Sequence, residues 1–136
     1  MIDLGVAVPV TKINVYSWHS CMNLGFPDDL RQAHRERAAQ NYVLYGHPGN
    51  EPPGVAADPA DSGRTLIARV NSDAYFGLTG IAQPPQQASS ISSARGTLGK
   101  YRHLLVIVQP TTGIDDDGTK RSFSTFFSEI DVYAAP

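Results

Sequence analysis

Hydrophobic and polar residues alternate most clearly near the end of the chain, between Ser122 and Tyr133. From residue 126 onward, one set of alternate positions holds Phe126, Ser128, Ile130 and Val132, and the other holds Phe127, Glu129, Asp131 and Tyr133. A period of two residues, rich in aromatic and β-branched side chains, is typical of a strand with one buried face. The pattern therefore predicts the closing strand of an all-β domain.

Similar patterns predict strands at residues 2–8, 11–17, 41–45, 64–70, 89–92 and 101–109. The first two are joined at Pro9, and in the second of them Ile13 and Val15 should face inward. The strand at 101–109 is apolar on both faces from Leu104 to Val108, which predicts a central strand covered on both sides. Strands without alternating helices indicate a two-sheet antiparallel β-sandwich within a single domain, residues 1–136.

The stretches between these strands are rich in turn-forming residues. A short helical insertion is predicted near 27–38, because Pro27, Asp28 and Asp29 suit a helix start and the arginines come later. Residues 46–63 and 71–87 have the glycine, proline and glutamine content of loops, and 111–121 are predicted to form a polar, hairpin-like loop.

Four stretches of the sequence resemble the discoidin family, also called coagulation factor 5/8 C-type or galactose-binding-like domains. They are Met1 to Tyr16, Gln40 to Gly46, Lys100 to Val108, and the Phe-Phe-Ser-Glu-Ile-Asp-Val-Tyr stretch that ends at Tyr133. The resemblance implies a jelly-roll fold, similar to carbohydrate-binding modules, and an extracellular or cell-surface setting. The family's usual N-terminal strand and loop are absent here. An open sheet edge would result, and such an edge predicts a homodimer.

Composition limits the classes of partner. The 136 residues carry a formal net charge of −2, which gives no concentrated basic surface for nucleic acid. No apolar run reaches the ~20 residues that a membrane-spanning helix needs, and no signal peptide is recognisable at Met1. With Cys21 as the single cysteine, an internal disulfide bond is excluded.

The family resemblance implies that a ligand binds on loops at one end of the sandwich. By position, this places Trp18, His19 and Arg37 at the site, where an aromatic ring can stack on a sugar and planar donors can bind hydroxyl groups. Structural roles are the alternative: Trp18 would close the core at the end of the sandwich, and Arg37 would pair with Asp28 or Glu36. Tyr75 and Phe76 are a second aromatic candidate, and their alternative is a strand packed into the core.

Calcium is the one cofactor that the sequence suggests. Glu129 matches a terminal-strand Glu that often holds a structural calcium in carbohydrate-binding relatives, although the partner loop of those relatives is missing here. The run Asp115 to Thr119 has the composition of a calcium loop, but an Asp-Gly turn explains it equally well.

Catalytic motifs are absent from the sequence. The histidines show no metal-ligand spacing, and there is neither a Gly-x-Ser-x-Gly elbow nor a phosphate-binding glycine loop. We therefore expect a non-catalytic domain that binds a glycan or polysaccharide. The alternative is a protein–protein interaction or structural accessory module of a larger protein.

Overall fold

The protein folds as an antiparallel β-structure in which one curled sheet contains six strands. The computed structural model describes residues 1–17, 40–54, 58–72, 88–114, 120–123, 125 and 127–135. The sheet has the order β3-β2-β5-β1-β4, and β8 also pairs with β1. Its strands are β1 (Ile2–Ser17), β2 (Asn41–His47), β3 (Thr65–Asn71), β4 (Ala88–Ser92), β5 (Gly99–Val108) and β8 (Phe127–Ala134). Strands β6 (Thr111–Ile114) and β7 (Lys120–Phe123) form a separate hairpin. The all-β prediction is confirmed.

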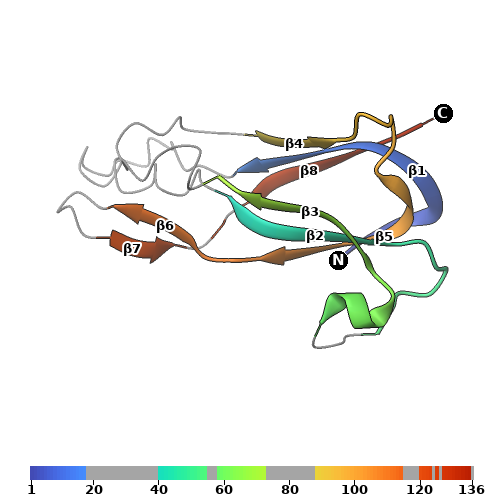
Figure 1. Ribbon diagram of the computed structural model, residues 1–136, viewed down its shortest axis with the longest axis horizontal. Helices are drawn as coiled ribbons and strands as arrows, with labels where there is room; N and C mark the ends of the chain where they lie inside the picture. The colour runs from blue at the N-terminus through green and yellow to red at the C-terminus, as the bar shows by residue number, and fades with distance from the viewer. Residues whose placement is uncertain are drawn as a thin grey trace.

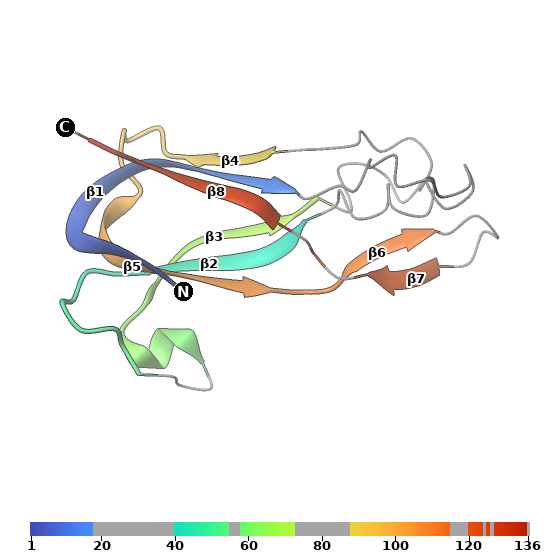
Figure 2. The same ribbon diagram turned by 180° about the vertical axis from the view of Figure 1, so that it is seen from behind.

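The long strand β1 gives the sheet its curl, because its two halves have different neighbours. Ile2 to Val10 pairs with β5, whereas Val10 to Ser17 lies between β4 and β8. As a result, β4, the second half of β1 and β8 lie over β2, β3 and β5, and the sheet forms a half-barrel (Figure 1). Figure 2 shows the same curl from behind.

The bend in β1 comes from a register shift beside Gly5. Asp3 pairs with His103 and Val8 pairs with Tyr101, so four residues of β1 face the single residue Arg102 of β5. Gly5 has a φ of 82°, a left-handed conformation that glycine adopts without steric cost. Extra residues on one strand increase its bend and twist, which explains how β1 passes from one side of the half-barrel to the other.

The core lies between the two sides of the half-barrel. It consists of Val10, Ile13, Val15, Tyr42, Leu44, Tyr101 and Leu104. The predicted inward positions of Ile13 and Val15 are confirmed, since both are fully buried. Across the core, the ring of Tyr42 meets Phe127 of β8 edge-on, with 5.7 Å between ring centroids. Edge-to-face packing stabilises an aromatic pair by more than the burial of its apolar surface alone.

Two strand predictions are corrected by the structure. Strand β1 continues through Pro9, where a break was predicted, because Pro9 lies where β1 changes partners and its carbonyl accepts a hydrogen bond from the Ala135 N–H at 2.9 Å. In β8, Phe127 packs against the core together with Ile130 and Val132, although it was predicted on the opposite face. A register shift between the Tyr16–Glu129 and Ser17–Phe127 pairs moves Phe127 to the inner side.

The central strand β5 is covered less evenly than its apolar sequence suggests. It does lie between β2 and β1, and Leu104 is fully buried. Burial decreases toward the end of the strand, where Val108 is 47% exposed. The predicted hairpin-like segment is confirmed as the β6–β7 pair, whereas the predicted helix near 27–38 lies outside the described residues.

Candidate functional site

The residues predicted to contact a ligand belong to two segments of the chain whose ends are described. Trp18, His19, Arg37, Tyr75 and Phe76 themselves lie outside the described residues. The first segment follows Ser17 of β1 and precedes Gln40, and the second follows Ser72 and precedes Ala88 of β4. The end of β1, the start of β2, the end of β3 and the start of β4, which flank these segments, lie at the same end of the half-barrel (Figure 1).

Gln40, one of these flanking positions, is hydrogen-bonded to residues at or near the other three. Its side chain is 1% exposed, and its Nε2 donates a hydrogen bond to the carbonyl oxygen of Val15 at 3.1 Å. The hydroxyl of Ser89 donates to Oε1 of the same amide. On the main chain, the Gln40 N–H donates to Ser72 Oγ at 2.7 Å, and the Ser72 N–H donates to the Gln40 carbonyl at 2.9 Å. One buried residue thus connects β1, the end of β3 and β4.

A second set of hydrogen bonds ties the β6–β7 hairpin to this end. The Thr125 hydroxyl donates to the carbonyl oxygen of Gln109 at 2.7 Å and accepts from the Asn41 N–H at 3.2 Å. The Asn41 side chain donates to the carbonyl oxygen of Pro110 at 2.8 Å. The hairpin therefore extends from the same end of the half-barrel (Figure 2). Its connection, which includes the Asp115 to Thr119 run, lies outside the described residues.

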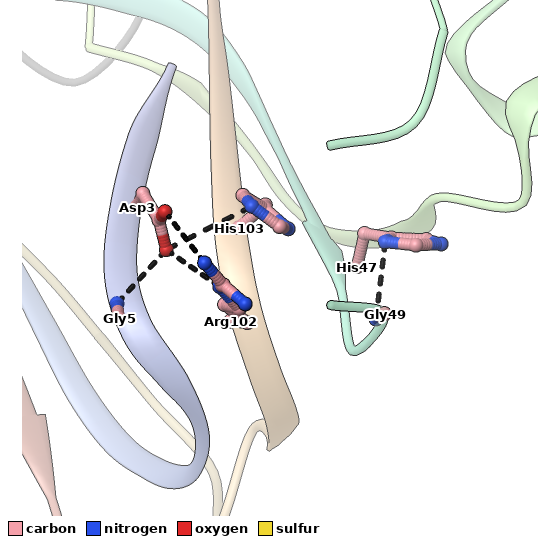
Figure 3. A network of polar contacts seen from close by, with 6 residues as sticks. All are labelled: Asp3, Gly5, His47, Gly49, Arg102 and His103. Atoms are coloured by element: carbon pink, nitrogen blue, oxygen red, sulfur yellow. Dashed lines mark hydrogen bonds and ion pairs between the residues drawn. The ribbon is translucent and has the colours of Figure 1, made fainter. Parts of the chain in front are cut away.

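At the opposite end of β2, the Asp3 carboxylate links β1 to β5. Arg102 donates to it through Nε at 2.9 Å and Nη2 at 3.1 Å, and the Gly5 N–H donates to Oδ1 at 2.8 Å (Figure 3). The hydrogen bond from Arg102, followed by that from Gly5, lowers the pKa of Asp3 to about 2. A carboxyl group that remains ionised at neutral pH cannot act as a general acid there. This contact therefore serves to fix the bend of β1.

Two histidines adjoin this ion pair, and the strand register explains their position. Asp3 pairs with His103, and His103 pairs with His47 of β2, so the three residues follow one another across three strands. His103 Nε2 lies 3.7 Å from Asp3 Oδ1, and the two imidazole ring centroids are 6.2 Å apart. His47 Nδ1 accepts a hydrogen bond from the Gly49 N–H at 3.1 Å (Figure 3).

The environment of His103 is tightly closed. Its side chain is 2% exposed, and Nδ1 has no hydrogen-bond partner among the described residues. Within that same part of the chain, no group of three or more His, Cys, Asp or Glu side chains is placed to hold a metal ion. Asp3, His103 and His47 are therefore not placed to hold a metal ion together.

Glu129, the candidate calcium ligand, is exposed on the outer face of β8. It pairs with Tyr16 of β1, and the neighbouring pairs on this face join Asn14 to Asp131 and Lys12 to Tyr133. The structure does not test calcium binding by Glu129, which remains a prediction.

The sequence reasoning identified neither Gln40 nor the ion pair at Asp3 as important. Gln40 stands just before the strand at 41–45, but a single polar residue at a strand boundary gives no periodic signal. Asp3 and Arg102 are far apart in the sequence, so only strand pairing reveals their contact. The alternation in β1 and β8 did, however, predict the polar outer face on which Glu129 lies.

Comparisons with protein-family models, curated proteins and solved structures found no significant match. In the described part of the chain, no helix is long and apolar enough to cross a membrane.

Proposed function

We propose that this protein is a non-catalytic carbohydrate-binding domain that holds its ligand at the Gln40 end of the half-barrel. One observation supports the proposal above others: the buried Gln40, which follows the first candidate segment, is hydrogen-bonded to Ser72 and Ser89 on either side of the second segment and to Val15 near the start of the first. Rigid anchoring of loop ends is the usual way in which a scaffold supports binding loops. Segments anchored together can contribute to one site, although they are separate in sequence.

The finer fold assignment is part of this proposal. The antiparallel half-barrel, with β1 shared between its two sides, is compatible with a jelly-roll sandwich of the discoidin type. In that interpretation, the connections at 18–39 and 73–87 are end loops. Trp18 would stack on the apolar face of a sugar ring, while His19 and Arg37 would donate hydrogen bonds to its hydroxyl groups. Tyr75 and Phe76 would add a second aromatic surface.

Affinity at a single site of this kind should be weak, because a shallow surface buries little of a hydrated ligand. Dimerisation would provide useful avidity. Strand β3 is an outer strand of the sheet, and its Leu66 is 45% exposed, so β3 is our candidate for an edge that pairs with a second copy.

A glycan-array screen with the purified chain tests the proposal directly. We expect binding to neutral glycans that falls by roughly tenfold or more in Trp18→Ala or Arg37→Met, because stacking or charge-assisted hydrogen bonds are lost. Screening with and without calcium, and with Glu129→Gln, tests the proposed structural calcium. The structural calcium is supported if a chelator abolishes glycan binding and Glu129→Gln has the same effect.

The matched control is Val6→Ala, which removes an exposed apolar side chain at the bend of β1 and should preserve binding to an immobilised glycan. A signal that depends on Tyr75 or Phe76 but not on Trp18 would move the site to the second segment. A folded protein that binds no glycan would overturn the proposal.

A further inference from the structure

The outer face of β4, β1 and β8 carries a regular array of polar and aromatic side chains, which we call the tyrosine face. Strand register gives three rows: Ser92–Lys12–Tyr133, Ser90–Asn14–Asp131 and Ala88–Tyr16–Glu129. Ile13 and Val15, which alternate with the β1 members of these rows, are fully buried in the core. The tyrosine face is therefore the side of this layer that is turned away from the core.

Both tyrosines on this face are held by their neighbours. The ammonium group of Lys12 lies 4.3 Å from the centroid of the Tyr133 ring, and the Tyr133 hydroxyl lies 3.4 Å from Asp131 Oδ2. The Asn14 side chain donates a hydrogen bond to the Tyr16 hydroxyl at 3.2 Å. Even so, Tyr133 is 41% exposed. A ring that is already oriented loses less conformational entropy when a ligand stacks on it.

The charges of this face restrict the ligand. Lys12 is the positive group of the three rows, and its ammonium lies over the Tyr133 ring. Glu129 and Asp131 contribute two carboxylates, so the face has a net charge of −1. The Asp131 carboxylate accepts the hydrogen bond of the Tyr133 hydroxyl and raises the pKa of Tyr133. Anionic ligands are thus disfavoured, whereas neutral ligands rich in hydroxyl groups find both donors and acceptors.

We propose that the tyrosine face is a second carbohydrate-binding surface, specific for neutral oligosaccharides that lie across β1 and β8. The inference rests on the proposed function, because it assumes a glycan ligand. It differs in location, since the ligand contacts β1 and β8 and not the end segments. The row that contains Tyr133 and the row that contains Tyr16 are four residues apart along β1, or ~13 Å. A ligand that extends across all three rows therefore contains several sugar units.

The neighbouring strand β4 leaves room for such a ligand. Its members of the three rows are Ala88, Ser90 and Ser92, which are small and exposed. Because these side chains beside Asn14 and Tyr16 are short, the surface of β4 leaves space for a chain of sugar rings to lie flat against the sheet. The hydroxyls of Ser90 and Ser92, together with Asp131 and Glu129, can then bind the ring hydroxyl groups.

The test is a titration of the isotope-labelled protein with neutral hexasaccharides of glucose, galactose or mannose, followed by amide chemical shifts. The same titration with a uronic acid hexasaccharide measures the effect of ligand charge. We expect shifts in β1 and β8 for a neutral ligand, roughly tenfold weaker binding in Tyr133→Ala and in Tyr16→Ala, and retained binding in Tyr133→Phe. Val6→Ala, at the exposed bend of β1, is the matched control on another surface.

A parallel titration of Trp18→Ala separates this inference from the proposed function. Neutral-ligand binding that is lost only in the tyrosine variants supports the tyrosine face and overturns the site at the end segments. Binding lost only in Trp18→Ala overturns the tyrosine face and leaves the proposed function intact. Shifts that each set of variants abolishes only at its own surface support two surfaces. Stronger binding of the uronic acid ligand, or no binding of any ligand, overturns the inference.

Discussion

At the scale of single residues, polar groups in this protein mainly hold strands in place. The Asp3 carboxylate receives hydrogen bonds from Arg102 of β5 and from Gly5 in its own strand. Gly5 lies at the bend of β1, so the carboxylate connects the bend to its partner strand. The ionised form of Asp3 is the one that makes these contacts, and this makes the bend sensitive to acid.

Acid should therefore weaken the native state through Asp3. Because the pKa of Asp3 is lowered from 3.8 to about 2, the unfolded chain binds more protons than the folded chain between these values. The stabilisation is present above about pH 4 and is lost as the pH falls toward 2. Urea unfolding at a series of pH values should show a steeper loss for the wild type than for Asp3→Asn.

Arg102→Gln provides the complementary measurement. Its guanidinium is the largest cause of the lowered pKa, so this variant should flatten the acid dependence in the same way as Asp3→Asn. If Arg102→Gln retained the wild-type slope, the ion pair would not be the source of the acid sensitivity.

At the scale of strands, packing between β2, β5 and β1 depends on a tyrosine that lies over two glycines. A Cβ atom at Gly46 would come within 2.4 Å of the Tyr101 ring, and a Cβ at Gly99 would come equally close to the Tyr101 hydroxyl. That hydroxyl donates to the carbonyl oxygen of Leu98 at 3.0 Å, and the ring belongs to the buried core. The ring therefore has little freedom to move aside.

Gly46→Ala should consequently destabilise the protein by about 1–3 kcal/mol, the usual cost of overpacking a core. Thermal or urea unfolding measures this change. Gly54→Ala is the matched control, because nothing lies within 4 Å of a Cβ at that position, and it should leave stability nearly unchanged. Equal stability of Gly46→Ala and the wild type would show that the Tyr101 ring can be displaced at little cost.

Strand positions were largely predictable from the sequence, whereas the irregularities that shape the sheet were not. The alternation around Ile13 and Val15 reports burial directly, and both residues are in the core. The bulge that turns Phe127 inward depends on pairing with β1, and no local pattern reveals it. Pro9 suggested a break because proline lacks an N–H donor, yet a position where a strand changes partners tolerates that loss.

At the scale of the whole molecule, Gln40 connects parts of the chain that are remote in sequence. Its amide joins Val15 to Ser89, and its main chain joins both to Ser72. The sequence predicted which segments could bind a ligand, but their shared anchor follows from the three-dimensional arrangement alone. Trp18, His19, Arg37, Tyr75 and Phe76 remain predictions.

Replacement of this anchor should loosen one end of the protein. Gln40→Leu leaves the Val15 carbonyl and the Ser89 hydroxyl without their partner in a buried site, which should cost about 1–3 kcal/mol. Hydrogen exchange should show the largest loss of protection in β4 and at the end of β1.

Gln109→Leu is the control for this substitution, because Gln109 is exposed at the same end of the molecule. It should leave both stability and exchange close to the wild type. Uniform loss of protection throughout the sheet in Gln40→Leu would contradict a local anchoring role.

The central place of β1 also has a consequence for how the chain reaches its native state. Ile13 pairs with Ile91 of β4 on one side and with Val132 of β8 on the other, and both partners come much later in the sequence. Folding rates fall when contacts join distant parts of a chain, since the entropy of closing long loops is lost before the contacts form. During synthesis, β1 emerges from the ribosome before any of its partners. Its apolar side chains are therefore not fully covered until β8 has been made, an interval in which the nascent chain is prone to aggregation.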